Sequence, residues 1–215
     1  MPQDEPRVEK ESREISRRDL IVSTAFVPLA ALASSCQAAA QIASKSAQAV
    51  ATALSPSQLK ILVAFVERLI PKDELGPSAA EAGAQIYIDR ALAGPNANEK
   101  QTFADGLAAM DAYARRTQGA AFAELEPEKR DAVMTAMDGG TAEGFDNARQ
   151  FFNRARRLTL EGMFGDPYYG GNKNFAGWDL IRYPGPRLST APEEQRMDKA
   201  PTPYRRSAYG PQYGH

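Results

Sequence analysis

Apolar residues recur at helical spacing through the middle of the chain. Ser55, Pro56 and Gln58 have the order of a helix start, in which Ser55 caps the first turn and Gln58 completes a capping box. The apolar positions that follow recur at helical spacing until Pro71, and they are Leu59, Leu62, Val63, Val66, Leu69 and Ile70. Because proline cannot continue a helix, the pattern predicts a first helix that ends before Pro71.

Four further segments show the same periodicity. Their expected bounds are residues 84–93, residues 99–116, Pro127 to the Gly139-Gly140 pair, and about residues 145–161. No segment alternates between apolar and polar residues as a half-buried strand would. The sequence therefore predicts a compact all-α domain of about five helices, with aromatic and Met residues on the helix stripes forming its core.

The first 40 residues have the order of a twin-arginine export signal. A polar stretch precedes Arg17 and Arg18, and an apolar segment follows over residues 20–33. This segment has only 14 residues and includes Pro28, whereas a membrane-spanning helix needs about 20 apolar residues. We therefore expect recognition by the twin-arginine export machinery and a mature chain in the periplasm.

Cys36, the single cysteine, leaves two outcomes open. Ala38-Ala39-Ala40 supplies a cleavage pattern, and a cut after Ala40 would remove Cys36 and leave residues 41–54 as a linker. Alternatively, Leu32 to Cys36 resembles a lipobox in which the leucine lies one position too far upstream, and Cys36 would then anchor a structural protein to lipid.

Composition excludes several kinds of redox and hydrolytic site. One cysteine and one histidine, the terminal His215, cannot provide a c-type haem site, an iron-sulfur cluster or a structural zinc site. A catalytic Ser-His or Cys-His pair is excluded for the same reason, and no glycine-rich dinucleotide or triphosphate motif occurs. We expect no catalytic residue, cofactor or metal on this chain.

The charge balance argues against a nucleic-acid partner. The chain has 26 Lys and Arg against 27 Asp and Glu, and beyond residue 40 the two counts are equal. A neutral domain has no surplus of cations for phosphates. The cluster of Arg154, Arg156 and Arg157 is interpreted as the solvated face of a helix.

Residues 161–186 differ in composition, with many Gly, Pro, Asn and aromatic residues, and are expected to form an irregular but ordered loop. Its aromatic residues serve either as interface anchors or as a lid over the helical core. They are Tyr168, Tyr169, Phe175, Trp178 and Tyr183. Glu161 and Asp166 are candidates for a carboxylate pair, although an acidic residue before proline in such a turn is typical of turn stabilisation.

Several motifs in this region resemble the gluconate 2-dehydrogenase subunit 3 family. The similarity rests on Gly162-x-Phe164-x-Asp166-Pro167-x-Tyr169-Gly170-Gly171-Asn172, on Gly177-Trp178 and on Tyr183-Pro184-Gly185. Upstream segments at residues 69–83 and 87–90 also resemble the family, so the resemblance covers about residues 55–187.

The resemblance implies a noncatalytic small subunit of a periplasmic, membrane-associated sugar or sugar-acid dehydrogenase. In such a complex a large flavoprotein binds FAD and oxidises the substrate, a c-type cytochrome with haem c accepts the electrons, and the small subunit supports export and maturation of the flavoprotein. The expected partner interface consists of Phe164, Asp166, Tyr168, Tyr169, Asn172, Trp178 and Tyr183. The alternative is a stand-alone periplasmic protein that binds a small ligand or acts as an enzyme.

The tail, residues 188–215, is rich in Pro and Tyr and is expected to have no core of its own. It is either disordered or extended along a partner, and its tyrosines suit the second role.

Overall fold

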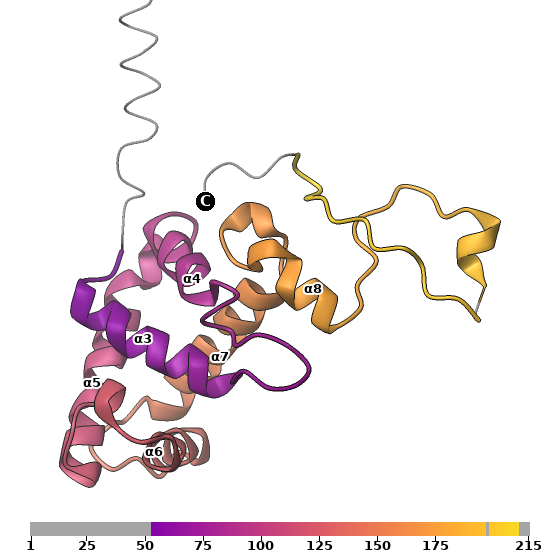
Figure 1. The fold of residues 1–215 in the computed structure, drawn as a ribbon. Helices are drawn as coiled ribbons and strands as arrows, with labels where there is room; N and C mark the ends of the chain where they lie inside the picture. The colour runs from indigo at the N-terminus through magenta and orange to yellow at the C-terminus, as the bar shows by residue number, and fades with distance from the viewer. Residues whose placement is uncertain (1–52, 197, 211–215) are drawn as a thin grey trace, which may run out of the picture. The chain divides into compact units, whose positions relative to one another are not determined.

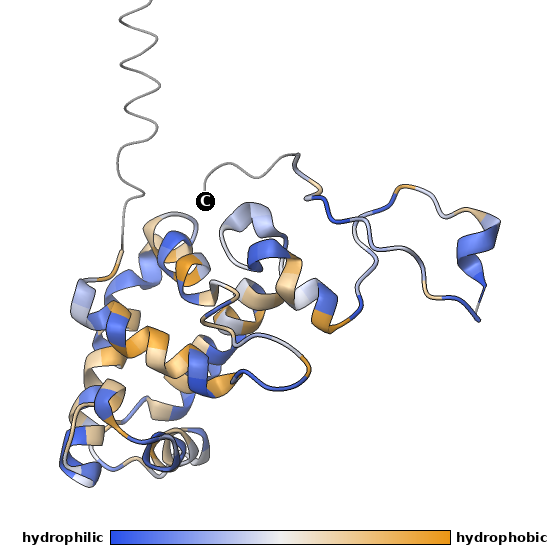
Figure 2. Cartoon of the chain, viewed as in Figure 1, coloured by the Kyte–Doolittle hydropathy of each residue, from blue (hydrophilic) through white to orange (hydrophobic). Residues whose placement is uncertain are grey.

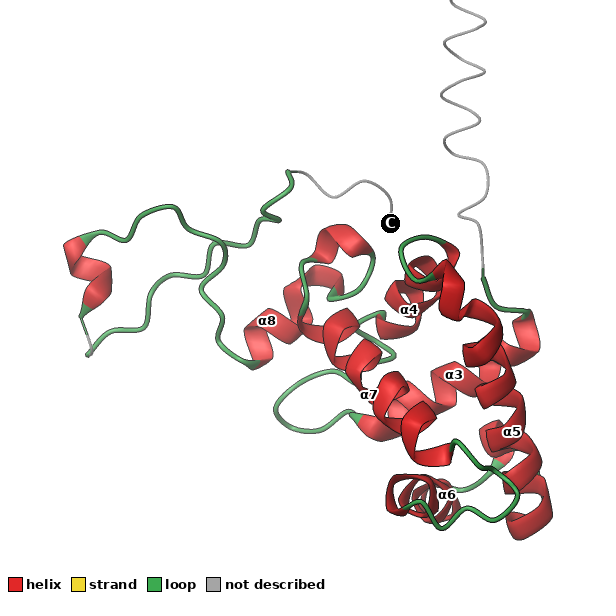
Figure 3. Cartoon of the chain, turned by 180° about the vertical axis from the view of Figure 1, so that it is seen from behind, coloured by secondary structure: helices red, strands yellow, loops and turns green. Residues whose placement is uncertain are grey.

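The computed structural model describes residues 53–196 and 198–210, in which the ordered elements are helices and turns (Figures 1 and 3). The described helices are α3 (Pro56–Leu69), α4 (Ala84–Ala93), α5 (Lys100–Gln118), α6 (Pro127–Gly139), α7 (Ala148–Phe164) and α8 (Ala176–Leu180). No strand occurs in these two ranges. The predicted all-α class is confirmed. Arg17, Arg18 and Cys36 lie outside the described residues, so their assigned roles stay predictions.

The five predicted helices correspond to α3 to α7, and α8 is additional. It lies within residues 161–186, where an irregular path was expected, and α7 also extends into this segment as far as Phe164. Periodicity failed to reveal α8 because a helix of five residues is shorter than two turns.

Helix α3 begins as its sequence predicts. The Ser55 hydroxyl accepts a hydrogen bond from the Gln58 amide at 3.3 Å, and the Gln58 side chain accepts one from the Ser55 amide at 2.9 Å. Immediately before this cap, the amides of Ala53 and Leu54 both donate to one carboxylate oxygen of buried Asp89, each at 2.9 Å. The packed domain therefore already includes the last two residues of the segment expected to be a linker.

Helices α4 and α7 pack closely and form the side of the domain from which the loop after α7 emerges. A Cβ atom on Gly162 would lie 3.0 Å from the Ala84 backbone, so the two helices approach where no side chain separates them. Tyr87 of α4 donates a hydrogen bond to Glu161 of α7 at 2.9 Å. Figure 2 shows apolar residues concentrated along α3, whose Leu62 and Phe65 are fully buried in the core.

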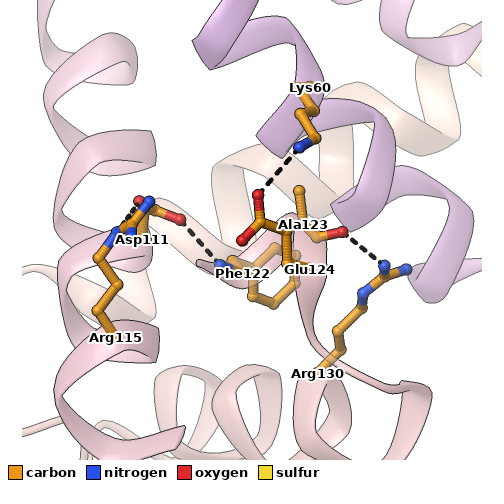
Figure 4. A network of polar contacts seen from close by, with 7 residues as sticks. All are labelled: Lys60, Asp111, Arg115, Phe122, Ala123, Glu124 and Arg130. Atoms are coloured by element: carbon orange, nitrogen blue, oxygen red, sulfur yellow. Dashed lines mark hydrogen bonds and ion pairs between the residues drawn. The ribbon is translucent and has the colours of Figure 1, made fainter. Parts of the chain in front are cut away.

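A polar network fixes the turn η2 (Phe122–Glu124), as Figure 4 shows. The Phe122 amide donates to Asp111 of α5 at 2.8 Å, and Lys60 of α3 pairs with Glu124 at 3.2 Å. Arg130 of α6 donates to a carbonyl of the same turn at 2.9 Å. Three helices thus hold one turn in place, and the buried Phe122 ring is kept in the core.

The described residues include no helix long and apolar enough to cross a membrane.

Candidate partner interface

Asn172 organises the loop between α7 and α8. Asn172 is fully buried, with 0% exposure. Its side-chain nitrogen, Nδ2, donates a hydrogen bond to the Gly165 carbonyl at 2.8 Å. Its side-chain oxygen accepts hydrogen bonds from the amides of Gly177 at 2.9 Å and Trp178 at 3.4 Å. One side chain therefore satisfies backbone groups at the end of α7 and in the first turn of α8, which a buried loop cannot leave unpaired.

Two glycines allow this loop to lie directly against the end of α7. A Cβ atom on Gly171 would lie 2.0 Å from the Gly162 carbonyl oxygen, and one on Gly177 would lie 1.9 Å from the Met163 carbonyl oxygen. Any larger residue would push the loop away from the helix. The glycine-rich composition is thus explained by close backbone approach.

The loop backbone is also conformationally demanding. Asn172, Asn174, Phe175 and Arg182 have φ between 47° and 62°, and no other described residue apart from glycine has a positive φ. The left-handed region costs a residue other than glycine about 1–2 kcal/mol, with asparagine affected least. Such conformations persist where the surrounding structure enforces them, and they cluster at sites that present side chains.

Trp178 and Tyr183 form the part of the loop nearest to α8. The Trp178 ring is buried and its indole nitrogen donates to the Phe164 carbonyl at 2.9 Å. Tyr183 packs edge-on against Trp178 with ring centroids 4.8 Å apart, and 39% of its surface remains exposed. One aromatic residue therefore covers the core while its neighbour faces solvent.

The two candidate carboxylates have structural partners. Asp166 accepts hydrogen bonds from the amides of Tyr168 and Ala208, at 2.9 and 2.8 Å. Glu161 accepts a hydrogen bond from the Tyr87 hydroxyl. Burial, together with this hydrogen bond, raises the pKa of Tyr87 to about 12. These contacts favour turn and helix stabilisation for both acids.

Tyr168 and Tyr169 project from the loop and contact a third tyrosine from the tail. Tyr209 lies with its ring centroid 5.1 Å from Tyr168 and 5.5 Å from Tyr169, while Tyr168 and Tyr169 are 5.3 Å apart. The exposed fractions of Tyr168, Tyr169 and Tyr209 are 44%, 45% and 59%. We call these three residues the tyrosine cluster.

The tail returns to the loop after an excursion. The Tyr204 amide donates to the Pro184 carbonyl at 2.8 Å, so residues 184 and 204 close the neck of a long loop. Within the excursion, Arg187 pairs with Glu194 and donates to the Thr202 carbonyl. Figure 2 shows that this excursion beyond α8 is largely hydrophilic. The tail was expected to be disordered or extended along a partner, and both alternatives stay predictions; residues 204 and 208 contact the loop of the same chain.

The residues assigned to a partner interface divide into two groups in the structure. Asn172 and Trp178 are buried and Phe164 and Asp166 are partly buried, so they position the loop. Tyr168, Tyr169 and Tyr183 are exposed and can touch another molecule. Ile181 and Tyr209 are exposed beside them and were absent from the expected set; the tyrosines of the tail were the only signal for Tyr209.

Comparison with known proteins agrees with the motifs around this loop. Residues 56–185 match the family model described as gluconate 2-dehydrogenase subunit 3. No protein of curated function and no solved structure matches the chain. The matched range contains α3 to α8 and the loop built on Asn172. The chain therefore belongs to the gluconate 2-dehydrogenase subunit 3 family.

Proposed function

We propose that this chain is the noncatalytic small subunit of a membrane-associated, FAD-dependent dehydrogenase of gluconate or a related sugar. The observation that carries the proposal is the family match over residues 56–185, because it includes every described α-helix and the loop that presents Tyr168 and Tyr169. In this proposal the large flavoprotein holds FAD and the substrate, and a cytochrome with haem c accepts the electrons. The small subunit docks on the flavoprotein in the periplasm and takes no part in the chemistry.

The construction of the loop supports a docking role. Tyrosines on a rigid backbone offer a large contact area with little loss of side-chain freedom, and tyrosine is enriched among residues that dominate binding energy. The loop holds its tyrosines through the buried Asn172 and Trp178 and through the Asp166 cap.

The test is immunoprecipitation of the native chain from periplasm, with an absorption spectrum and mass spectrometry of the recovered complex. A flavin spectrum and a flavoprotein in equal amount to the chain are expected. A colourless chain recovered alone under gentle conditions would contradict the subunit role.

We further propose that the chain exports the flavoprotein through its twin-arginine signal. Replacing Arg17→Lys and Arg18→Lys together is expected to hold both proteins in the cytoplasm. The matched control replaces Arg7→Lys and Arg13→Lys, which leave the paired arginines intact, and export should continue. If the flavoprotein still reaches the periplasm with the first variant, the export role is wrong and the subunit role is untouched.

A second candidate function is small-ligand binding by the isolated chain. It is favoured by a hollow of about 610 Å³ between the start of α5 and α7. The hollow is lined by Phe103, Phe145 and Phe151, and by the Glu99–Arg154 ion pair. Apolar walls with a few polar groups are typical of ligand pockets. A rise in the melting temperature of the isolated chain with gluconate or glucose, absent for a chain with Phe103→Ala, would favour this function.

A further inference from the structure

We propose that tail residues 204–210 form the second half of the surface that docks on the flavoprotein. This inference rests on the proposed function, since its partner is the flavoprotein of the same complex. It goes beyond the family match, because residues 204–210 lie outside the matched range 56–185.

The tail is attached to the loop by specific polar contacts. Arg205 makes two hydrogen bonds to the Asp179 carboxylate, at 3.2 and 2.8 Å, and the Ala208 amide donates to Asp166 at 2.8 Å. Ser207 is 5% exposed, in contrast to its neighbours. These contacts give residues 204–210 a defined position on the loop, so their side chains are presented in fixed register with it.

Residues of the loop and of the tail line one open groove. Its volume is about 350 Å³, and its loop side includes the rings of Phe164, Trp178 and Tyr183 together with Ile181. Ala208 and Tyr209 of the tail also line the groove. The tyrosine cluster continues this surface, because Tyr209 belongs to both. An exposed aromatic groove next to partly exposed tyrosines is typical of a protein-binding site.

The charges at the rim indicate what kind of surface fits. Arg182 lies between the groove residues Ile181 and Tyr183, and Arg206 lies two residues before Ala208. Both arginines are exposed, and within residues 53–196 and 198–210 neither forms an ion pair, whereas Asp179 is already paired with Arg205. Asp166 is the one carboxylate among the described residues that line the groove, and its two oxygens accept the amides of Tyr168 and Ala208, so the two arginines leave a net positive charge beside the groove.

A second copy of this chain is a poor occupant for that reason. A symmetric contact would place the same surface on both sides and bring arginine toward arginine. A flavoprotein surface with an apolar side chain to enter the groove and carboxylates around it would be complementary in shape and charge. We therefore assign the groove to an acidic-rimmed surface of the flavoprotein.

The test measures the affinity of the full chain for the flavoprotein that co-purifies with it. Tyr209→Ala is expected to weaken binding about 10- to 30-fold, the range for loss of a strong interface residue, and Tyr209→Phe should retain most of the affinity because it keeps the ring. The matched control is Leu160→Ala, which removes a half-exposed side chain from α7 outside the groove and should bind as the original chain does.

Charge reversal tests the acidic rim separately. Arg182→Glu with Arg206→Glu should weaken binding at least about tenfold at low salt, and the difference should shrink near 1 M salt, where the screening length falls to about 3 Å. Lys129→Glu, an exposed position on α6, is the control and should have no such effect. Circular dichroism establishes that each variant keeps its helices, and a chain truncated after residue 203 provides a second test of the tail.

The outcomes separate this inference from the proposed function. Full binding by both Tyr209→Ala and the truncated chain would overturn the role of the tail while leaving the subunit role intact. Absence of any flavoprotein partner for the unaltered chain would overturn both. Self-association that is lost in Tyr209→Ala would assign the groove to a second copy and overturn the inference.

Discussion

Asn172→Ala should destabilise the loop strongly, because this side chain pairs groups that cannot reach water. Two well-formed side-chain hydrogen bonds are lost, to the Gly165 carbonyl at 2.8 Å and from the Gly177 amide at 2.9 Å. A buried group left unpaired costs about 1–3 kcal/mol, and alanine at φ 47° adds about 1 kcal/mol. We expect a loss of about 3–7 kcal/mol in the free energy of unfolding of the loop.

The assay uses Trp178, the single tryptophan, as a local probe of the loop. Its fluorescence in urea reports exposure of the buried indole, while circular dichroism reports the helices. In Asn172→Ala the fluorescence transition should occur at lower urea than the helical transition, since the lost bonds join the loop to α7 and α8.

Two further variants separate the hydrogen bonds from the backbone strain. Asn172→Gly loses the same bonds but adopts positive φ without penalty, so it should be about 1 kcal/mol more stable than Asn172→Ala. Asn174→Ala is the matched control, because Asn174 also has a positive φ, of 56°, but is exposed. This variant should lose only about 1 kcal/mol in the free energy of unfolding. Equal small losses for Asn172→Ala and Asn174→Ala would refute the argument from buried hydrogen bonds.

Two other predictions follow from packing and titration. Gly106→Ala should lower the free energy of unfolding by about 1–3 kcal/mol despite the better helix propensity of alanine, because the new Cβ would lie 2.2 Å from the Phe151 ring. The control is Gly139→Ala, where the nearest atom is 3.7 Å away. It should be neutral or stabilising in the same thermal unfolding experiment. Burial first, and then the hydrogen bond to Glu161, raise the pKa of Tyr87 to about 12. An unfolded tyrosine titrates near pH 10, so the contribution of Tyr87 is complete below about pH 10 and is lost as the pH rises toward 12. Unfolding measured across this range should show that loss, and Tyr87→Phe should remove it.

Features that depend on neighbouring residues could be predicted from the sequence. The helix periodicity, the Ser55 cap and Pro71 predicted α3 with its correct start, and the periodic segments after it predicted α4 to α7, because repeated spacing of three and four residues marks the buried face of a helix. The motifs around Asp166 and Asn172 indicated the family for the same reason, since they can be recognised without knowing what they touch.

The way the loop is held, and the residues that lie beside it, depend on contacts between distant parts of the chain. Asn172 pairs with groups from α7 and α8, and nothing in its local sequence distinguishes such a buried linking residue from one in an exposed turn. Tyr209 joins Tyr168 because the Ala208 amide reaches Asp166 across 42 residues. Contacts over that distance depend on the path of the whole chain, which periodicity and turn composition leave undetermined.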